Sequence, residues 1–255
     1  MAIAFGASTT SGVISSVSSN TFSSPSISGS DTILIVCVAN RDGASDTDGE
    51  VTSITHNGLS LTKAHSSSYP NAAYLEAQIW YRVAPSTGVN NITVNYTGTI
   101  DTGAVWAAYF TGVDQTTVGD KIGAANNDAA SATDPAVTLT TTHNGSLIMS
   151  VVYNKTGSNL TIGGGQTSLT QQNVNAGGDR ADAGYVIQGT AGSITPTWVA
   201  SPDDDWVQVS VEFLAAATGS TSLIKSVSTV AKASIKSIST VPIASIKKIN
   251  GVTNT

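Results

Sequence analysis

The sequence predicts an all-β protein: an antiparallel β-sandwich, jelly-roll-like and built from two similar halves, followed by an extended β-like repeat tail. Three observations lead to this prediction. Short apolar or alternating segments are separated by turn residues up to about residue 214, without a convincing helical period. The same order of similar segments occurs twice within that region. Beyond residue 220 the chain changes to a repeat with an 11-residue period.

The internal similarity is clearest in one pair of apolar segments. Residues 33–40 (ILIVCVAN) have a second copy in 147–154 (LIMSVVYN), and each copy is followed by a basic residue. Residues 104–110 and 207–213 form a later pair at a similar offset. We therefore expect one body over residues 1–214, with similar halves at about 27–113 and 136–214, because matching segments in the same order indicate a duplicated plan.

Several further elements are expected in the first half. Residues 1–30 are Ser-rich with scattered apolar residues and predict one or two short strands. Residues 51–55 and 59–63 flank His56-Asn57-Gly58, and Asn-Gly between alternating segments is a strong hairpin signal. Residues 73–84 alternate, which predicts a strand with Leu75 and Ile79 on a buried face and Glu76, Gln78, Trp80 and Arg82 on a mostly wet face.

The remaining elements follow the same logic. Residues 91–96 and 104–113 are expected to be two strands that complete the first half, and 114–135 a polar crossing. The strands expected in the second half are 136–142, 146–154, 167–172, 183–188, 194–199 and 206–214.

The C-terminal region is expected to form a separate segment. Residues 215–220 read as a linker, and 221–255 contain three copies of an 11-residue repeat in which four columns align. Ser, Thr, Val and Ile dominate the copies, and Pro242 and Gly251 interrupt them, so an extended conformation is favoured over a helix. Single copies cannot bury their apolar residues alone, which favours trimerisation or docking to a neighbour; a disordered basic tail is the alternative. The apolar column residues are Ile224, Val227, Val230, Ile235, Ile238, Val241, Ile246, Ile249 and Val252.

Composition and charge narrow the class of protein. Charged residues make up only 11% of the chain, and Ser, Thr, Asn and Gly replace them, as expected for an extracellular or virion-type β protein. All acidic residues lie at or before Glu212, which gives an acidic body that should repel nucleic acid. No segment approaches the roughly 18 apolar residues of a membrane span, and we expect neither membrane insertion nor a signal peptide. The lone Cys37 lies in an apolar segment and is expected to be a buried structural thiol.

Few residues suggest chemistry, and we predict no catalytic residues and no enzyme activity. No nucleophile and base stand at a recognisable spacing around His56, His65 or His143. The best metal candidate is the acidic loop 42–50, in which Asp46, Asp48 and Glu50 have a spacing suited to Ca²⁺. The loop lacks the full twelve-residue pattern of an EF-hand, so a solvated acidic loop is the stronger interpretation, and no cofactor other than this Ca²⁺ is expected.

A carbohydrate-binding module is the alternative function. Flat aromatic rings can stack on sugars, but aromatic residues in strands more often belong to the core or cover a sheet. The candidate rings are those of Trp80, Trp106, Trp198, Trp206, Tyr69, Tyr74 and Tyr185. This hypothesis would make a cell-surface glycan the partner, with help from Ca²⁺.

The C-terminal copies, particularly residues 244–252 (ASIKKINGV), resemble terminal repeats of structural proteins of tailed bacteriophages. In the body, residues 51–62, 79–85 and 109–114 are similar to β-sandwich modules of phage fibre, tail and head-decoration proteins. The resemblance implies a non-enzymatic virion component that assembles in the host cytoplasm and binds other virion proteins, as a homo-oligomer for which a trimer is favoured. It transfers no catalytic residue.

Overall fold

The computed structural model describes residues 1–42, 49–69, 74–127, 134–155, 159–175, 178–200 and 205–217, together with residues 248–249 and 252–253. The chain divides into two units, Met1–Ala216 and Ala217–Thr255. All regular elements in the described residues are β-strands and every strand pair is antiparallel, so the predicted all-β class is confirmed.

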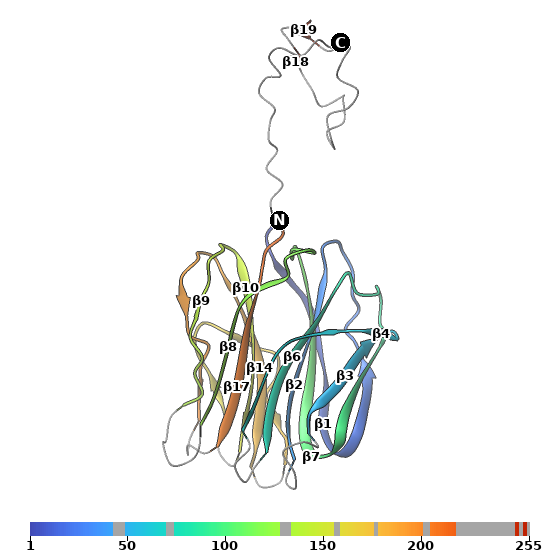
Figure 1. The fold of residues 1–255 in the computed structure, drawn as a ribbon, viewed down its shortest axis with the longest axis vertical. Helices are drawn as coiled ribbons and strands as arrows, with labels where there is room; N and C mark the ends of the chain where they lie inside the picture. Colours follow the sequence, from blue (N-terminus) through green and yellow to red (C-terminus); the bar gives the residue numbers. More distant parts are fainter. Residues whose placement is uncertain are drawn as a thin grey trace. The chain divides into compact units, whose positions relative to one another are not determined.

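The first half of the body forms one sheet (Figure 1). Its order is β4-β3-β7-β2-β6-β5, and β1 pairs with β7. The strands are β1 (Ala4–Ser23), β2 (Ile33–Arg41), β3 (Val51–His56), β4 (Leu59–Ser60), β5 (Thr62–Tyr69), β6 (Leu75–Val83) and β7 (Asn91–Thr111).

The second half forms a second sheet with the order β12-β14-β10-β17-β8, in which β13 also pairs with β14. Two short pairs, β11 with β16 and β9 with β15, lie outside this sheet. The strands are β8 (Gly119–Asn127), β9 (Leu139–Thr140), β10 (Ser146–Asn154), β11 (Thr161–Ile162), β12 (Thr167–Ser168), β13 (Gln172–Asn173), β14 (Arg180–Gln188), β15 (Ser193–Ile194), β16 (Trp198–Val199) and β17 (Trp206–Phe213).

The two sheets share one plan. Strand β2 lies between β6 and β7, and β10 lies between β14 and β17 in the same way. Beyond β7 lies β1, as β8 lies beyond β17, and the opposite edges are β5 and the β12/β13 pair. The predicted internal similarity therefore corresponds to equivalent strands. The expected jelly-roll-like sandwich can now be described more specifically: each half of the chain supplies one whole sheet.

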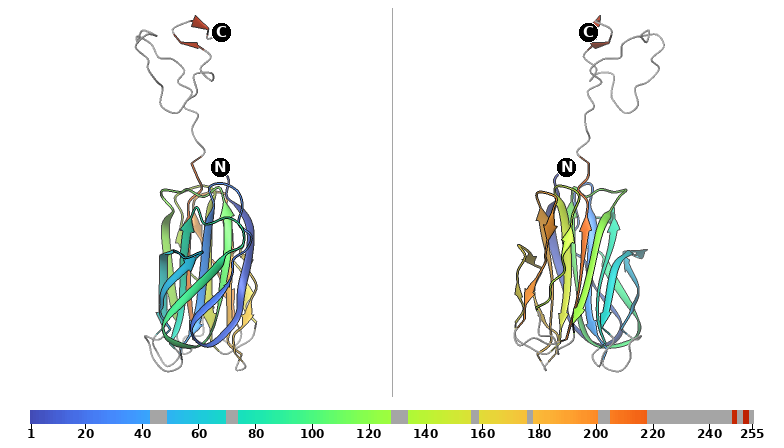
Figure 2. Two further views of the ribbon diagram at one scale, coloured as in Figure 1. Left: turned by 90° about the vertical axis from the view of Figure 1, so that its right-hand side faces the viewer. Right: turned by 60° about the vertical axis from the view of Figure 1, so that its left-hand side comes forward.

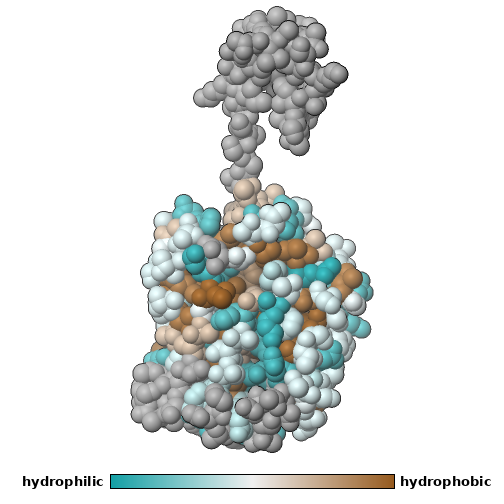
Figure 3. Space-filling model, in the orientation of Figure 1, coloured by the Kyte–Doolittle hydropathy of each residue, from teal (hydrophilic) through white to brown (hydrophobic). Residues whose placement is uncertain are grey.

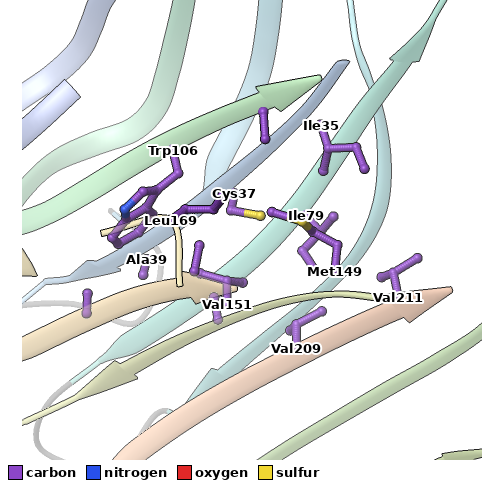
Figure 4. Close-up of a cluster of buried hydrophobic side chains, with 14 of the residues drawn as sticks. Ile35, Cys37, Ala39, Ile79, Trp106, Met149, Val151, Leu169, Val209 and Val211 are labelled. Carbon is purple, nitrogen blue, oxygen red and sulfur yellow. The ribbon is translucent and has the colours of Figure 1, made fainter. Parts of the chain in front are cut away.

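A hydrophobic core lies between the two sheets. In Figure 4, Ile35, Cys37 and Ile79 of the first sheet face Met149 and Val151 of the second. These side chains occupy alternate positions of their strands, so each sheet directs one face to this core. The thiol of Cys37 is completely buried here, as predicted, and burial raises its pKa far above the usual range.

The outward faces of the central strands are buried as well. Strand β7 pairs with β3 along its first part and with β2 along its second, so the first sheet bends over its own outward face (Figure 2). Leu34, Val36 and Val38 pack there against Ile54 of β3. In the second half, Val152 packs against Trp198 of β16. Coverage on both faces explains why β2 and β10 are almost continuously apolar.

The predicted hairpin around Asn57-Gly58 is confirmed. Strand β3 ends at His56 and β4 begins at Leu59, which leaves a two-residue turn. Both turn residues have positive φ, 52° for Asn57 and 75° for Gly58, as a type I′ turn requires.

Several predicted boundaries were wrong. One long strand, β7 (Asn91–Thr111), replaces the two expected at 91–96 and 104–113, and residues 1–30 contain the long β1 with register shifts rather than short strands. The supposed crossing 114–135 contains β8, which has one large apolar residue, Ile122, and follows β17 through backbone pairing. Residues 136–142, 167–172 and 194–199 form only two-residue strands.

The body has two distinct ends. At the terminal end, the amino group of Met1 donates a hydrogen bond to the carbonyl of Ala216 (2.9 Å). The opposite end, here the loop end, is where Arg41 pairs with Leu75 and Thr102 in the first sheet. Asn154 pairs there with Arg180 and Trp206 in the second sheet. Figure 1 shows these ends on opposite sides of the body.

Exposed apolar residues are spread over several elements. Figure 3 shows hydrophobic patches separated by neutral and hydrophilic side chains on one face of the body. Such scattering is normal for a folded surface and marks no single interface in the described part of the body. The large exposed apolar side chains are Met1, Phe5, Val13, Leu59, Val89, Ile122, Ile187 and Val199.

Candidate functional site

The predicted Ca²⁺ ligands fall at the loop end, and only one of them can be described. Asp46 and Asp48 lie outside the described residues. The Glu50 side chain is 58% exposed, and one carboxylate oxygen lies 3.3 Å from Nζ of Lys63. The backbone carbonyl of Glu50 accepts hydrogen bonds from the amide and the hydroxyl of Thr97. Glu50 is therefore held beside β7, with its charge directed to a lysine.

Next to this ion pair, a row of polar side chains lines the outward face of β6. Nε2 of Gln78 donates to Oε2 of Glu76 (2.7 Å), and Nε1 of Trp80 donates to Oε1 of Gln78 (2.9 Å). The ammonium of Lys63 lies 5.2 Å from the centroid of a Trp80 ring. The expectation of a wet face was wrong for Glu76, Gln78 and Trp80, which are all buried.

Burial makes Glu76 unusual among the acidic residues. Desolvation raises its pKa to about 7, and the charges of Glu50 and Asp42 act in the same direction. The hydrogen bond from Gln78 and the charge of Lys63 oppose the increase. This carboxyl group can consequently take up a proton near neutral pH, a property that a solvated glutamate lacks.

The second half has its own buried carboxyl group on the outward face of β14. Asp182 accepts hydrogen bonds from the Ser168 hydroxyl (2.9 Å to Oδ1) and from Nε1 of Trp198 (3.2 Å to Oδ2). Burial raises the pKa of Asp182 to about 6, although these two hydrogen bonds favour the ionised form. Asp182 thereby ties β14 to its neighbour β12 in the sheet and to the covering strand β16.

A charged cluster connects the two sheets at the loop end. Nη1 of Arg41, at the end of β2, donates to Oδ2 of Asp179 (2.8 Å), just before β14. The Tyr153 hydroxyl of β10 donates to the same oxygen (2.8 Å). Burial and then the Asp179 charge raise the pKa of Tyr153 well above its ordinary value. We call Arg41, Asp179 and Tyr153 the inter-sheet cluster.

Two further contacts support this end. The Thr102 hydroxyl of β7 donates to the carbonyl of Val174, so it also joins the two halves. Within the second half, Nζ of Lys155 lies 3.0 Å from Oδ2 of Asp205. All these groups fix chain segments to one another, and none of these contacts pairs a nucleophile with a base.

The histidines occupy unrelated positions. His56 is completely buried, and both ring nitrogens lack a hydrogen-bond partner. Burial lowers its pKa, with a further contribution from the charge of Arg82. Burial also lowers the pKa of His65 on β5. The Nδ1 atom of His143 lies 3.1 Å from the hydroxyl of the neighbouring Thr142 at an exposed position.

The aromatic residues are mainly interior. Trp106 and Trp198 are completely buried, Trp206 and Trp80 nearly so, and Tyr69 is also buried. Tyr185 is partly buried, and its ring stacks on Phe5 at a centroid distance of 5.0 Å. Tyr74 is partly exposed at the loop end. The four indole rings therefore belong to the core or cover a sheet, which leaves the carbohydrate-binding hypothesis without most of its ring faces.

Most of the predicted docking residues cannot be placed. Seven of the nine apolar column residues, from Ile224 to Ile246, lie outside the described residues. Ile249 in β18 (Lys248–Ile249) pairs with Val252 in β19 (Val252–Thr253). The extended conformation expected for the whole segment stays a prediction.

The polar clusters of the body were missed at the sequence level, for a physical reason. Glu76, Gln78 and Asp182 occur at alternate positions of strands, where polar residues usually face water. Their burial depends on covering strands from distant parts of the chain. The only available signal was the continuous apolar character of β2 and β10, which indicates that both faces of each sheet are covered.

Among the described residues, no group of three or more His, Cys, Asp or Glu side chains is placed to hold a metal ion. The described segments also include no helix with the length and hydrophobicity needed to cross a membrane. In comparisons with known proteins, no family model, no curated protein and no solved structure matches this chain.

Proposed function

We propose that this protein is a non-enzymatic structural component of a virion, of the fibre, tail or capsid-decoration type. In this proposal the β-sandwich body is displayed on the particle, and the C-terminal repeat segment mediates assembly. The partners are other virion proteins and further copies of the same chain, with a trimer favoured, and the chain assembles in the host cytoplasm.

The observation that carries the proposal is that buried polar side chains of the body bond to other parts of the body. In the inter-sheet cluster, Arg41 joins the two halves by bonding Asp179 (2.8 Å), and Tyr153 bonds the same Asp179 oxygen from within the second half (2.8 Å). Glu76 and Asp182 are bound to side chains of their own half. A protein that must remain folded on a particle benefits from such contacts, whereas catalysis requires groups that can reach a substrate.

The ends of the body fit a displayed module. Met1 and Ala216 are joined by a hydrogen bond, so the body continues into the repeat segment from its terminal end. The loop end lies on the opposite side of the body (Figure 1). A body attached at its terminal end would leave its loop end accessible.

The experiment that tests the assembly role is the solution mass of the full chain beside a truncated chain ending at Ala217, by light scattering at several concentrations. We expect a trimer for the full chain and a folded monomer for the truncated chain. A matched full-length variant, Ile224→Asn, Ile235→Asn and Ile246→Asn, keeps length and charge and should also be monomeric. A full chain that stays monomeric at every concentration would contradict self-assembly through the repeats.

A further inference from the structure

A surplus of hydrogen-bond acceptors occurs on the outward face of the first sheet at the loop end. Asn40 of β2 and Glu76 of β6 are directly paired across the two strands, and both are buried. The Glu76 charge also acts on Tyr96 of β7, whose pKa is raised by burial and then by this carboxylate. Three oxygen-bearing side chains from three strands therefore share one region.

Two of these oxygens have no partner. Oδ1 of Asn40 and the hydroxyl oxygen of Tyr96 lack a hydrogen bond within the described part of the chain, although Asn40 is completely buried and Tyr96 is only 6% exposed. Two neighbouring side-chain amides donate to other acceptors. Nδ2 of Asn40 donates to the carbonyl of Gly49 (3.0 Å), and Nε2 of Gln78 donates to Glu76 (2.7 Å). Unpaired acceptors in such a location are costly unless something else satisfies them.

Two carboxylates and one ammonium group act electrostatically on Glu76. The carboxylates of Glu50 and Asp42 act on Glu76 with the same sign. The described cation of this region, Lys63, lies 3.3 Å from the Glu50 carboxylate. A buried carboxyl group beside unpartnered acceptor oxygens matches the chemistry of a hard cation, which prefers carboxylate and amide oxygens.

We propose that this region binds a hard metal cation, with the Glu76 carboxylate and Oδ1 of Asn40 as protein ligands. A water molecule on the cation would donate to the Tyr96 hydroxyl oxygen. The site differs from the acidic loop pattern of Asp46, Asp48 and Glu50, and it does not depend on the proposed assembly role. With one carboxylate ligand, its affinity for Ca²⁺ should be weak, with a Kd on the order of 0.1 to 1 mM.

The test is thermal unfolding of the full chain after chelator treatment, in CaCl₂, MgCl₂ or NaCl at matched ionic strength. With CaCl₂ at about 10 mM we expect Tm to rise by about 3 °C or more, since only the folded state has the site. Glu76→Gln should abolish the rise. Asp182→Asn changes the matched buried carboxyl group of the second half and should keep it.

The proposal is overturned if none of these salts raises the wild-type Tm beyond the matched NaCl control. A rise that persists in Glu76→Gln, or that disappears equally in Asp182→Asn, would also overturn it. If Glu76→Gln fails to fold, Tyr96→Phe gives a second measurement, because it removes an oxygen that has no hydrogen bond. In this variant the Ca²⁺ concentration at half-maximal effect should rise about tenfold, and an unchanged midpoint would count against the site.

Discussion

The outward faces of the two central sheets occupy equivalent places but differ in chemistry. In the first half, Val105 and Ala107 of β7 pack in a hydrophobic cluster. The equivalent positions of β17 are Gln208 and Ser210, which are completely buried yet polar. The Ser210 hydroxyl lies 2.8 Å from that of Ser150, and Nε2 of Gln208 donates to the carbonyl of Pro196 (3.1 Å).

This difference shows what the shared plan requires. The inward faces are apolar in both halves, because the two sheets must bury them against each other. The outward faces need only be covered. Apolar packing can do this, and so can polar side chains that form hydrogen bonds with their neighbours. The chain therefore repeats its strand order without repeating its outward side chains.

The largest effect is expected at the inter-sheet cluster, which joins the halves. Arg41→Gln removes the guanidinium that bonds Asp179, whose side chain is only 1% exposed. Breaking a buried pair by removing one partner typically costs about 3 to 5 kcal/mol. Urea unfolding of the truncated chain should show a loss of this size, and a loss below about 1 kcal/mol would mean that the cluster does not hold the halves together.

The second effect is a dependence of the stability on pH. Burial raises the pKa of Glu76 from 4.5 to about 7, so the folded state binds more protons than the unfolded state between these values. Wild-type stability should therefore increase as pH falls from about 7 towards 4.5, and decrease as pH rises through 7, by roughly 3 kcal/mol in total.

Glu76→Gln should lose this dependence and be the more stable protein at pH 8, measured in the presence of a chelator. Both proteins retain His56 and His65, whose lowered pKa values act in the opposite direction below about pH 6.5, so those contributions cancel in the difference. Parallel stability curves for the two proteins would contradict this assignment.

A smaller effect is expected at the serine pair of the second half. Ser210→Ala leaves the buried Ser150 hydroxyl without its described partner and should cost about 1 to 2 kcal/mol, whereas changing both to Ala should cost much less. In the first half, Ala107→Ser places a hydroxyl in an apolar cluster and should destabilise by a similar amount. Additive losses in the serine double variant would show that the two hydroxyls are not coupled.

The smallest effect is expected for the exposed ion pair. Glu50→Gln removes the partner of Lys63, but the Glu50 side chain is more than half exposed. Exposed pairs contribute about 0 to 1 kcal/mol, and salt screens them. A loss as large as that of Arg41→Gln would indicate that Glu50 has a further structural role.

Much of the fold could be predicted from the sequence, because its strongest patterns are local. The copies at 33–40 and 147–154 became equivalent central strands, and Asn57-Gly58 became the expected tight turn. Strand β8 was missed because its sequence has little β propensity. Its backbone pairing with β17 holds it in the sheet instead.

The candidate sites were harder to predict, because they depend on long-range coverage. Glu76 and Asp182 became buried only when strands far away in the sequence closed over them. Arg41 and Asp179 are separated by 138 positions, and no local pattern indicates that they meet. The acidic loop was recognised from its spacing, but spacing alone could not show that Glu50 faces Lys63.

The two halves act as one structural body, and calorimetry of the truncated chain ending at Ala217 tests this most directly. The continuous core between the sheets and the inter-sheet cluster predict one unfolding transition with equal calorimetric and van't Hoff enthalpies. Two separate transitions, of which only one shifts in Arg41→Gln, would contradict a single body. Each half would then be an independent domain.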